Sequence, residues 1–320
     1  MTRIVAATLV CLFAVAASGA QDEKSQLRYG FKKGEKFPMK MTYGMGVKLD
    51  KVPEAFQGVL SDEPINLKLE GTLDMEVKDV AENGKAVLEG TWKTMKAKGA
   101  VMVNDVDFNY DSEKKDAVKP KKKEEGEDPG LQGFFDLEDQ LRKTATQPLK
   151  LTVDDRGKVT VDGASAKGMG EMNAMFLSMN GLMGALPKDK VGQGDTWKEE
   201  TKLSMPGVGG AVDIRVKSEN KWESTETVEG KPFAVIKSKF AVGGDVKAEG
   251  EGDNNPFNIK MKTVGDGEGK TSFAVKGGFA SKVQGALKVK VSATVPNPGG
   301  GDDMDIKATL KIEQSLEIKK

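Results

Sequence analysis

Long runs of alternating apolar and polar residues dominate this sequence. Side chains of a β-strand point alternately to the two faces of a sheet, so this period predicts strands with one dry and one wet face. In the clearest run the apolar residues are Ile65, Leu67, Leu69, Leu73, Met75 and Val77. A second run comprises Met304, Ile306, Ala308, Leu310, Ile312, Leu316 and Ile318. Strands of this length reach about 40–50 Å, which favours a tall, curved antiparallel sheet with one covered face.

Shorter runs predict further strands. They cover residues 36–49, 85–96, 146–153, 157–162, 210–223, 232–243, 257–263, 271–283 and 285–295. Turn sequences at 82–85, 154–157 and 229–231 place glycine where a hairpin needs a positive φ, so neighbouring strands are expected to pair as hairpins. Residues 79–87 loosely resemble 225–233, which fits either a duplicated half or two unrelated hairpins of similar build.

The sequence GDGEGKT at residues 265–271 ends like a phosphate-binding loop. That motif needs a glycine where this chain has Val264, and it opens a helix, whereas a strand is expected to follow here. A hairpin turn is therefore the preferred interpretation.

Residues 111–130 carry a dense mixture of lysine and acidic residues without apolar periodicity. Such a segment is typical of a solvated, mobile loop. The alternative interpretation is a docking segment for a partner.

A methionine-rich stretch follows Gly163. Its apolar residues recur at spacings of three and four, which predicts a helix that begins near Ser165 and ends before Pro187. Several glycines lower its intrinsic stability, so we expect it to form only when packed against the sheet. The helix either fills the concave sheet as core or forms a pliable wall over an apolar ligand. The candidate ligand-binding residues are Met169, Met172, Phe176, Met179 and Met183.

The first twenty residues resemble a secretory signal peptide. A basic Arg3 precedes an apolar run from Ile4 to Ala17, and small residues at 18–20 provide the cleavage site. The run is shorter than the roughly 20 residues that cross a bilayer, so no membrane anchor is expected in the mature chain. We therefore expect an exported protein, periplasmic or extracellular.

The chain has no histidine, and its one cysteine, Cys11, lies in the apolar run. The chain after residue 20 therefore contains neither residue type. General bases, thiolate nucleophiles and transition-metal ligands of the common kinds are thus missing, and we expect no enzymatic activity, no catalytic residue and no cofactor. The 49 Lys and Arg residues balance 49 Asp and Glu residues, which argues against a nucleic-acid partner.

Acidic clusters offer only weak alternatives to this interpretation. Asp302, Asp303 and Asp305 stand beside glycines and could hold calcium, but they do not match the twelve-residue calcium loop. A glycosidase would need a carboxylate pair, and few aromatic residues are present to stack on sugar rings. Trp92, Trp197 and Trp222 lie in or beside predicted strands and are expected to pack in the core.

Three segments together resemble a family of exported bacterial proteins, abundant in planctomycetes, that carry a domain of unknown function. They are LRYGFKKGEKF at 27–37, LTVDDRGKVTVDG at 151–163 and LPKDKVGQGDTWKEE at 186–200. The insertion at 111–130 and the extra Gly192-Gln193 step depart from the family pattern. The resemblance implies a secreted, β-rich fold and supplies no catalytic residues.

Taken together, these features predict a mainly β fold with one or two helices (α+β), in which a long curved antiparallel sheet or half-open β-barrel packs on the methionine-rich helix. We expect a signal peptide at 1–20, a β-rich half at 21–163 and a second half at 164–320 that packs with the first as one unit. The leading functional hypothesis is binding of a lipid or other apolar molecule between sheet and helix. The alternative is a structural or adaptor protein that binds an envelope protein through its sheet surface or edges.

Overall fold

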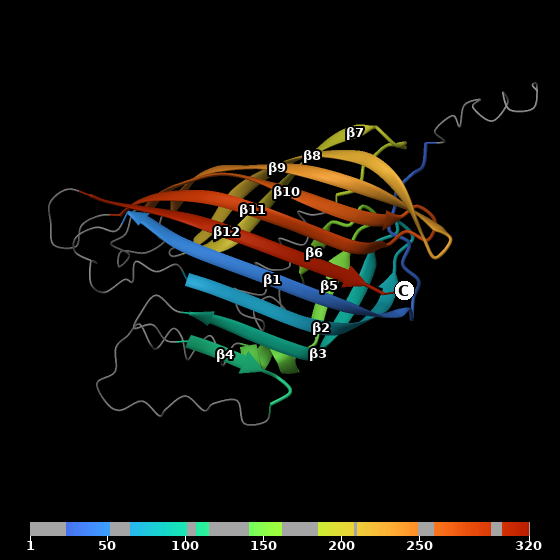
Figure 1. Cartoon of the computed structure of the whole chain (residues 1–320), viewed down its shortest axis with the longest axis horizontal. Helices are drawn as coiled ribbons and strands as arrows, with labels where there is room; N and C mark the ends of the chain where they lie inside the picture. The colour runs from blue at the N-terminus through green and yellow to red at the C-terminus, as the bar shows by residue number, and fades with distance from the viewer. Residues whose placement is uncertain are drawn as a thin grey trace, which may run out of the picture.

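The computed structural model describes residues 24–51, 65–100, 107–114, 141–161, 185–207, 210–248, 259–295 and 303–319. Their strands are β1 (Lys36–Lys51), β2 (Ile65–Val80), β3 (Ala86–Ala100), β4 (Asp107–Asp111), β5 (Leu149–Val153), β6 (Val159–Val161), β7 (Thr196–Gly207), β8 (Gly210–Val228), β9 (Lys231–Ala248), β10 (Ile259–Ala274), β11 (Ala280–Val295) and β12 (Met304–Ile318). All twelve belong to one sheet, shown in Figure 1.

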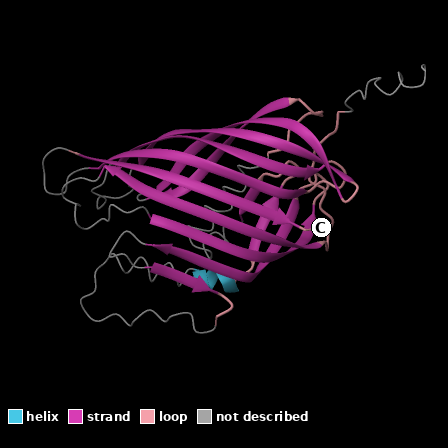
Figure 2. Cartoon of the chain, in the orientation of Figure 1, coloured by secondary structure: helices cyan, strands magenta, loops and turns pink. Residues whose placement is uncertain are grey.

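The strand order is β6-β5-β3-β2-β1-β12-β11-β10-β9-β8-β7, with β4 paired to β3 outside this path. Every pairing is antiparallel, and the β1–β12 pair joins strands from the two ends of the chain. The sheet curls but stays open, because β6 and β7 at its two edges do not pair. Figure 2 shows the described part as strands with one short helix, at 141–146. This confirms the predicted mainly β fold with a long, curved antiparallel sheet.

The three predicted hairpin turns are confirmed. Gly84, Gly157 and Gly230 adopt positive φ angles of 78°, 85° and 76° between consecutive strands. Glu229, the residue before Gly230, is also left-handed at 51°. Glycine carries no Cβ that this backbone conformation would bring into conflict, which is why these sequences reverse the chain so tightly.

Several strand boundaries differ from the prediction, and β4 was not predicted. The turn expected near residue 284 lies instead at 275–279, where Gly277 and Gly278 have φ angles of 105° and 62°. The sequence analysis also missed β7, which pairs with β8 from Thr196↔Lys221 to Gly207↔Gly210. Its inward positions include the charged Glu199, which interrupts the apolar alternation.

The predicted hairpin turn at 265–271 is wrong, because these residues lie inside β10. Gly265, Gly267 and Gly269 share the inner face of this strand, and larger side chains on neighbouring strands cover them. A Cβ at Gly267 would lie 2.9 Å from Leu287 Cδ1, and one at Gly269 would lie 3.0 Å from Phe240 Cε2. The glycines therefore make room for the side chains of β9 and β11.

The dry face of the sheet points to its concave side and carries the core. In β1 every second residue is buried, as in Phe37, Met39, Met41 and Tyr43. Their register partners on β2 include Met75, Leu73 and Leu69. The main cluster extends over β1, β2, β3 and β5, and a second gathers around Phe273 on β10. Leu316 on β12 packs against both clusters, so the two halves of the chain share a contiguous apolar interior.

The wet face carries charged ladders across neighbouring strands. Lys78 lies 3.1 Å from Glu76 and 3.7 Å from Glu89, and the hydrogen bond from Lys78 lowers the pKa of the Glu76 carboxyl. Pairs as exposed as these contribute little to stability. Of the predicted charged loop, Asp111 ends β4 and residues 115–130 lie outside the described residues, as do the predicted signal peptide and cleavage site.

Candidate functional site

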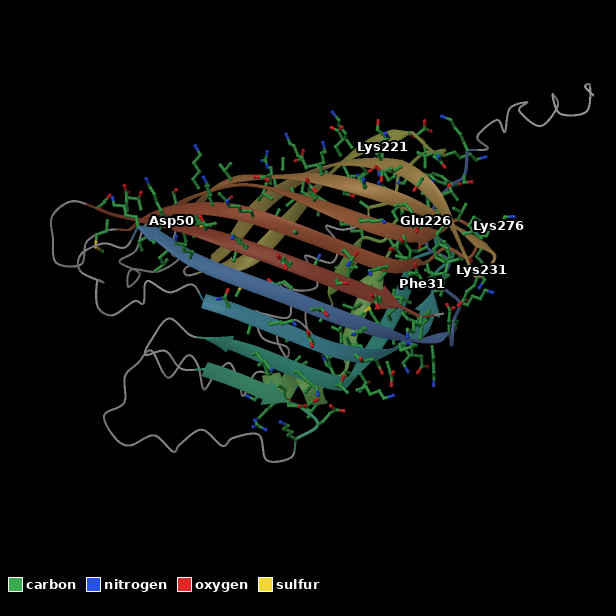
Figure 3. All side chains as sticks on the ribbon, viewed as in Figure 1. Phe31, Asp50, Lys221, Glu226, Lys231 and Lys276 are labelled. Carbon is green, nitrogen blue, oxygen red and sulfur yellow. The ribbon has the colours of Figure 1, made fainter. Side chains whose placement is uncertain are left out.

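One end of the sheet is crossed by the segment that precedes β1. Residues 24–35 run from the start of β7 to the end of β2, and their backbone bonds to several turns on the way. Ser25 pairs with Val191, Tyr29 N donates to Asp155 O at 2.7 Å, and Gly30 N donates to Gly278 O at 2.8 Å. Phe31, Lys231 and Lys276 are all at this end of the sheet, whereas Asp50 lies at the opposite end (Figure 3).

Arg28 fastens this crossing segment, residues 24–35, to both edges of the sheet. Its guanidinium donates to Pro187 O at 2.6 Å and to Lys188 O at 2.5 Å, in the stretch that leads into β7. Its Nε lies 3.0 Å from the carboxylate of Asp155 in the β5–β6 turn. Lysine could not make these contacts together, because only the planar guanidinium presents several donors in a fixed fork.

A second arginine joins the two edges directly. Arg156, in the β5–β6 turn, forms a short ion pair with Glu199 on β7, and both side chains are about four-fifths buried, with exposures of 22% and 19%. Arg156 Nε also donates to Leu186 O at 2.8 Å, and Leu186 N donates to Arg156 O at 3.0 Å. Side-chain and loop contacts thus hold together two sheet edges that share no strand pairing at this end.

Replacing Arg156 with methionine is expected to lower the free energy of unfolding by about 1–2 kcal/mol, because Glu199 loses a charged hydrogen-bond partner in a mostly buried place. Denaturant unfolding measures the change. Lys198→Met is the matched control. Lys198 is exposed on β7, next to Glu199, and its ammonium group lies 3.7 Å from the carboxylate of Glu219. Its effect should be close to zero. Equal effects of the two variants would contradict this role for Arg156.

Beneath the crossing segment lies a partly open apolar cavity of about 100 Å³. Its walls come from the crossing segment and from strands β1, β2, β3, β5, β6, β11 and β12. The lining residues are Tyr29, Phe31, Phe37, Met39, Met75, Leu88, Leu151, Val153, Gly157, Val159, Phe279, Ala280, Val283, Leu316 and Ile318. An apolar cavity of this kind can accept an apolar guest.

Aromatic packing holds the roof of the cavity in place. The rings of Tyr29 and Phe31 stack with centroids 5.7 Å apart, and Tyr29 meets Phe273 edge to face at 5.2 Å. Gly157 allows this arrangement, because a Cβ there would overlap the Tyr29 ring. Burial raises the pKa of the Tyr29 hydroxyl, so the one titratable lining residue stays neutral at physiological pH. The cavity is therefore suited to an uncharged group.

A larger, open groove of about 1220 Å³ lies over the wet face. Its floor includes the small residues Gly44, Gly46 and Ala286, and its charged lining residues are Lys68, Lys98, Lys237, Lys270, Lys311, Glu268 and Glu313. Nearby carboxylates compensate part of this charge, since Lys68 lies 2.6 Å from Glu70 and Lys237 lies 2.7 Å from Glu223. The hydrogen bond from Lys68 also lowers the pKa of Glu70. This groove is open to solvent and combines apolar surface with charged side chains.

The predicted site residues are only partly placed. Met169, Met172, Phe176, Met179 and Met183 lie outside the described residues. The same is true of Asp302, while Asp303 is exposed and Asp305 accepts a hydrogen bond from Thr294 Oγ1 at 3.0 Å. Within the described ranges, no three His, Cys, Asp or Glu side chains come together to hold a metal ion.

Sequence reasoning did not predict that the crossing segment would line a cavity. The aromatic residues of Tyr29-Gly30-Phe31 were a usable signal, because two rings directly before a strand seldom stay exposed. In the described parts of the chain, no helix is long and apolar enough to span a membrane.

No protein-family model and no curated protein matches the chain. Among solved structures, one similar chain comes from "Lipid-protein interactions in lipovitellin", with a TM-score of 0.41 and 10% identity over 91% of this chain and 26% of that one. The chain thus spans about a quarter of the lipovitellin chain. Another is OmpTdeltaL8, a loop L8 deletion mutant of the Vibrio cholerae outer membrane protein OmpT, with a TM-score of 0.17 and 12% identity over 90% of this chain and 100% of that one. At these TM-scores neither likeness defines a function for this chain.

Proposed function

We propose that this is an exported, non-enzymatic protein of the cell envelope that binds a lipid or another apolar molecule on the concave face of its sheet. The observation that carries the proposal is the uncharged cavity of about 100 Å³ at the crossed end of an apolar interior. The signal-peptide pattern of residues 1–20 and the lack of histidine and of cysteine beyond residue 20 support export and a non-catalytic role.

The volume of the cavity bears on the kind of ligand. An engineered apolar cavity of about 150 Å³ accepts benzene, so this partly open cavity of 100 Å³ accommodates a small apolar group at one end of a ligand whose remainder lies outside it. The end of an acyl chain is such a group. The rest of the chain would extend along the half-buried inner residues Met45, Leu287 and Leu310, and the methionines from Met169 to Met183 would form the opposite wall.

Filling the cavity should abolish binding of its guest. Ala280→Leu places a larger side chain in the cavity wall, so we expect the affinity for the neutral fluorescent probe N-phenylnaphthylamine to fall at least tenfold, the ratio that about 1.4 kcal/mol represents. Fluorescence titration measures the change. Val283→Phe fills the same cavity from β11 and serves if Ala280→Leu folds poorly.

Ala241→Leu is the matched control, because it makes the same change at an exposed position on β9. It should bind the probe as the unaltered protein does. If both folded cavity variants also bind the probe with unchanged affinity, the cavity is not the binding site and the proposal is wrong.

The wet-face groove favours a second candidate function, that of an adaptor. Its length across β3, β2, β1, β12, β11, β10 and β9 would suit a polar surface of another envelope protein. Cross-linking in envelope preparations, followed by mass spectrometry, tests this function. Cross-links from Lys98 and Lys311 to one partner would support it, and their absence would leave apolar binding as the better account.

A further inference from the structure

Lysines gather on the wet face toward the end of the sheet that carries Asp50, away from the crossing segment (Figure 3). They come from the adjacent strands β1, β12, β11 and β10, and all of them are exposed. Among the residues that the structure describes, none of these lysines has a carboxylate at ion-pair distance. This lysine patch comprises Lys48, Lys51, Lys262, Lys288, Lys290, Lys307 and Lys311.

Toward the crossed end, by contrast, opposed lysines of the wet face have carboxylates beside them. Lys270 on β10 and Lys237 on β9 are register partners. Lys237 lies 2.7 Å from Glu223, and Lys270 lies 3.9 Å from Glu226, both on β8. The two carboxylates offset the repulsion between the two ammonium groups.

The register of the lysine patch opposes lysines without such ion pairs. Lys51 on β1 is the partner of Lys307 on β12, and Lys311 on β12 is the partner of Lys288 on β11. Like charges directly opposite each other destabilise a sheet. Two pairs of this kind on three neighbouring strands therefore do not serve the stability of the sheet, and they point to a role in binding.

Acidic residues offset the charge of the lysine patch only in part. Asp50 and Asp305 lie within it, but each already accepts a hydrogen bond from a threonine hydroxyl, at 2.6 and 3.0 Å. Asp266 is the register partner of Lys288 and forms no ion pair with it. The carboxylates at its border toward the crossed end are Glu268 and Glu313. The patch thus keeps a surplus of positive charge, which attracts an anionic partner.

An exposed valine lies among these lysines. Val264 on β10 is 55% exposed, and its register partners are Lys290 on one side and Gly243 on the other. A Cβ at Gly243 would meet nothing within 4 Å, so the surface beside Val264 is open. Cations spread over four strands around an apolar residue suit a bilayer surface, because its anionic headgroups move laterally to meet the cations and its apolar region lies directly beneath. A folded acidic protein would instead have to match the position of each lysine.

We propose that the lysine patch docks this protein on a membrane surface that carries anionic phospholipid headgroups, with Val264 directed toward the bilayer. Each lysine near such a surface adds to the attraction, and salt screens it. This inference goes beyond the proposed function, because it concerns the opposite face of the sheet and requires no ligand in the apolar cavity.

Sedimentation with lipid vesicles tests the inference. The unaltered protein should bind vesicles of phosphatidylcholine that contain about one third phosphatidylglycerol, should not bind vesicles of phosphatidylcholine alone, and should be released at about 0.5 M NaCl. The double variant Lys288→Gln, Lys311→Gln removes one opposed pair of the patch and should weaken binding about tenfold or more. It should unfold at no lower temperature than the unaltered protein, because it loses a repulsion and no ion pair.

The double variant Lys36→Gln, Lys78→Gln is the matched control. It removes the same charge from the same face, but at the crossed end, where both lysines lie beside Glu76 at 3.6 and 3.1 Å. It should bind the anionic vesicles as the unaltered protein does.

Three results would overturn the inference. The first is no binding of the unaltered protein to anionic vesicles at low salt, and the second is an equal loss of binding in the two double variants. The third is binding to soluble polyglutamate without binding to vesicles, because an acidic protein would then be the partner. All three can be found while N-phenylnaphthylamine still binds, so membrane docking and the proposed function are tested separately.

Discussion

Phe273→Ala is expected to lower the free energy of unfolding by about 3–5 kcal/mol, the usual effect of removing a buried phenylalanine ring. Phe273 is 0% exposed, and its register partners on the two neighbouring strands are Ala234 and Ala280. These small side chains cannot fill the cavity that removal of the ring would leave. The loss also removes the ring against which Tyr29 packs. Equilibrium unfolding in guanidinium chloride measures the change.

Val264→Ala is the control for this experiment. Val264 belongs to the same strand but is 55% exposed on the wet face, and its truncation should change the free energy of unfolding by less than about 0.5 kcal/mol. If the Phe273 variant is no less stable than the Val264 variant, the crossed end of the sheet is not packed as described.

Gly267→Val is expected to destabilise the protein by about 2–3 kcal/mol, although valine favours strands and glycine does not. The added Cβ would overlap Ala286 O and lie 2.9 Å from Leu287 Cδ1, so the backbone of β11 would have to move. Thermal and denaturant unfolding both report the change.

Gly243→Val on β9 provides the matched control, since a Cβ there meets nothing within 4 Å. This replacement should be neutral or stabilising by about 0.5–1 kcal/mol, because it removes the conformational freedom of glycine. Opposite signs for the two glycines are the expected result. A stabilising Gly267→Val would mean that the inner glycines of β10 do not serve to admit Leu287.

The long strands and hairpins could be predicted from the sequence because their signals are local. Alternation specifies which face of a strand is buried, and glycine at Gly84, Gly157 and Gly230 marks the turns. The pairing of β1 with β12 could not be predicted in this way, since it depends on how the whole sheet curls and joins residues more than 250 positions apart, as in Met39↔Ile318.

The errors in the sequence analysis have definite physical causes. Glycines at 265, 267 and 269 look like turn residues, yet here they pack under larger side chains of adjacent strands, which is a tertiary property. In β7 the inward Glu199 breaks the apolar alternation because it binds Arg156 across the sheet edges. A charged residue on a dry face thus concealed a strand.

The candidate site was only partly accessible to sequence reasoning. The sequence predicts an apolar site lined by methionines of residues 169–183, which lie outside the described residues, whereas the cavity in the structure lies at the crossed end of the sheet. Tyr29 and Phe31, which form the roof of the cavity, belong to a segment without periodic apolar residues. Only the contacts of this segment with distant turns show that it covers the cavity.

The most direct test of apolar binding is mass spectrometry of the small molecules released by denaturing the protein, purified without detergent from a bacterial periplasm. The proposed function predicts one lipid or other apolar compound in stoichiometric amount. Ala280→Leu protein prepared in parallel should release less of it. A protein that releases no apolar compound, and that also fails to take up N-phenylnaphthylamine, would contradict the proposal.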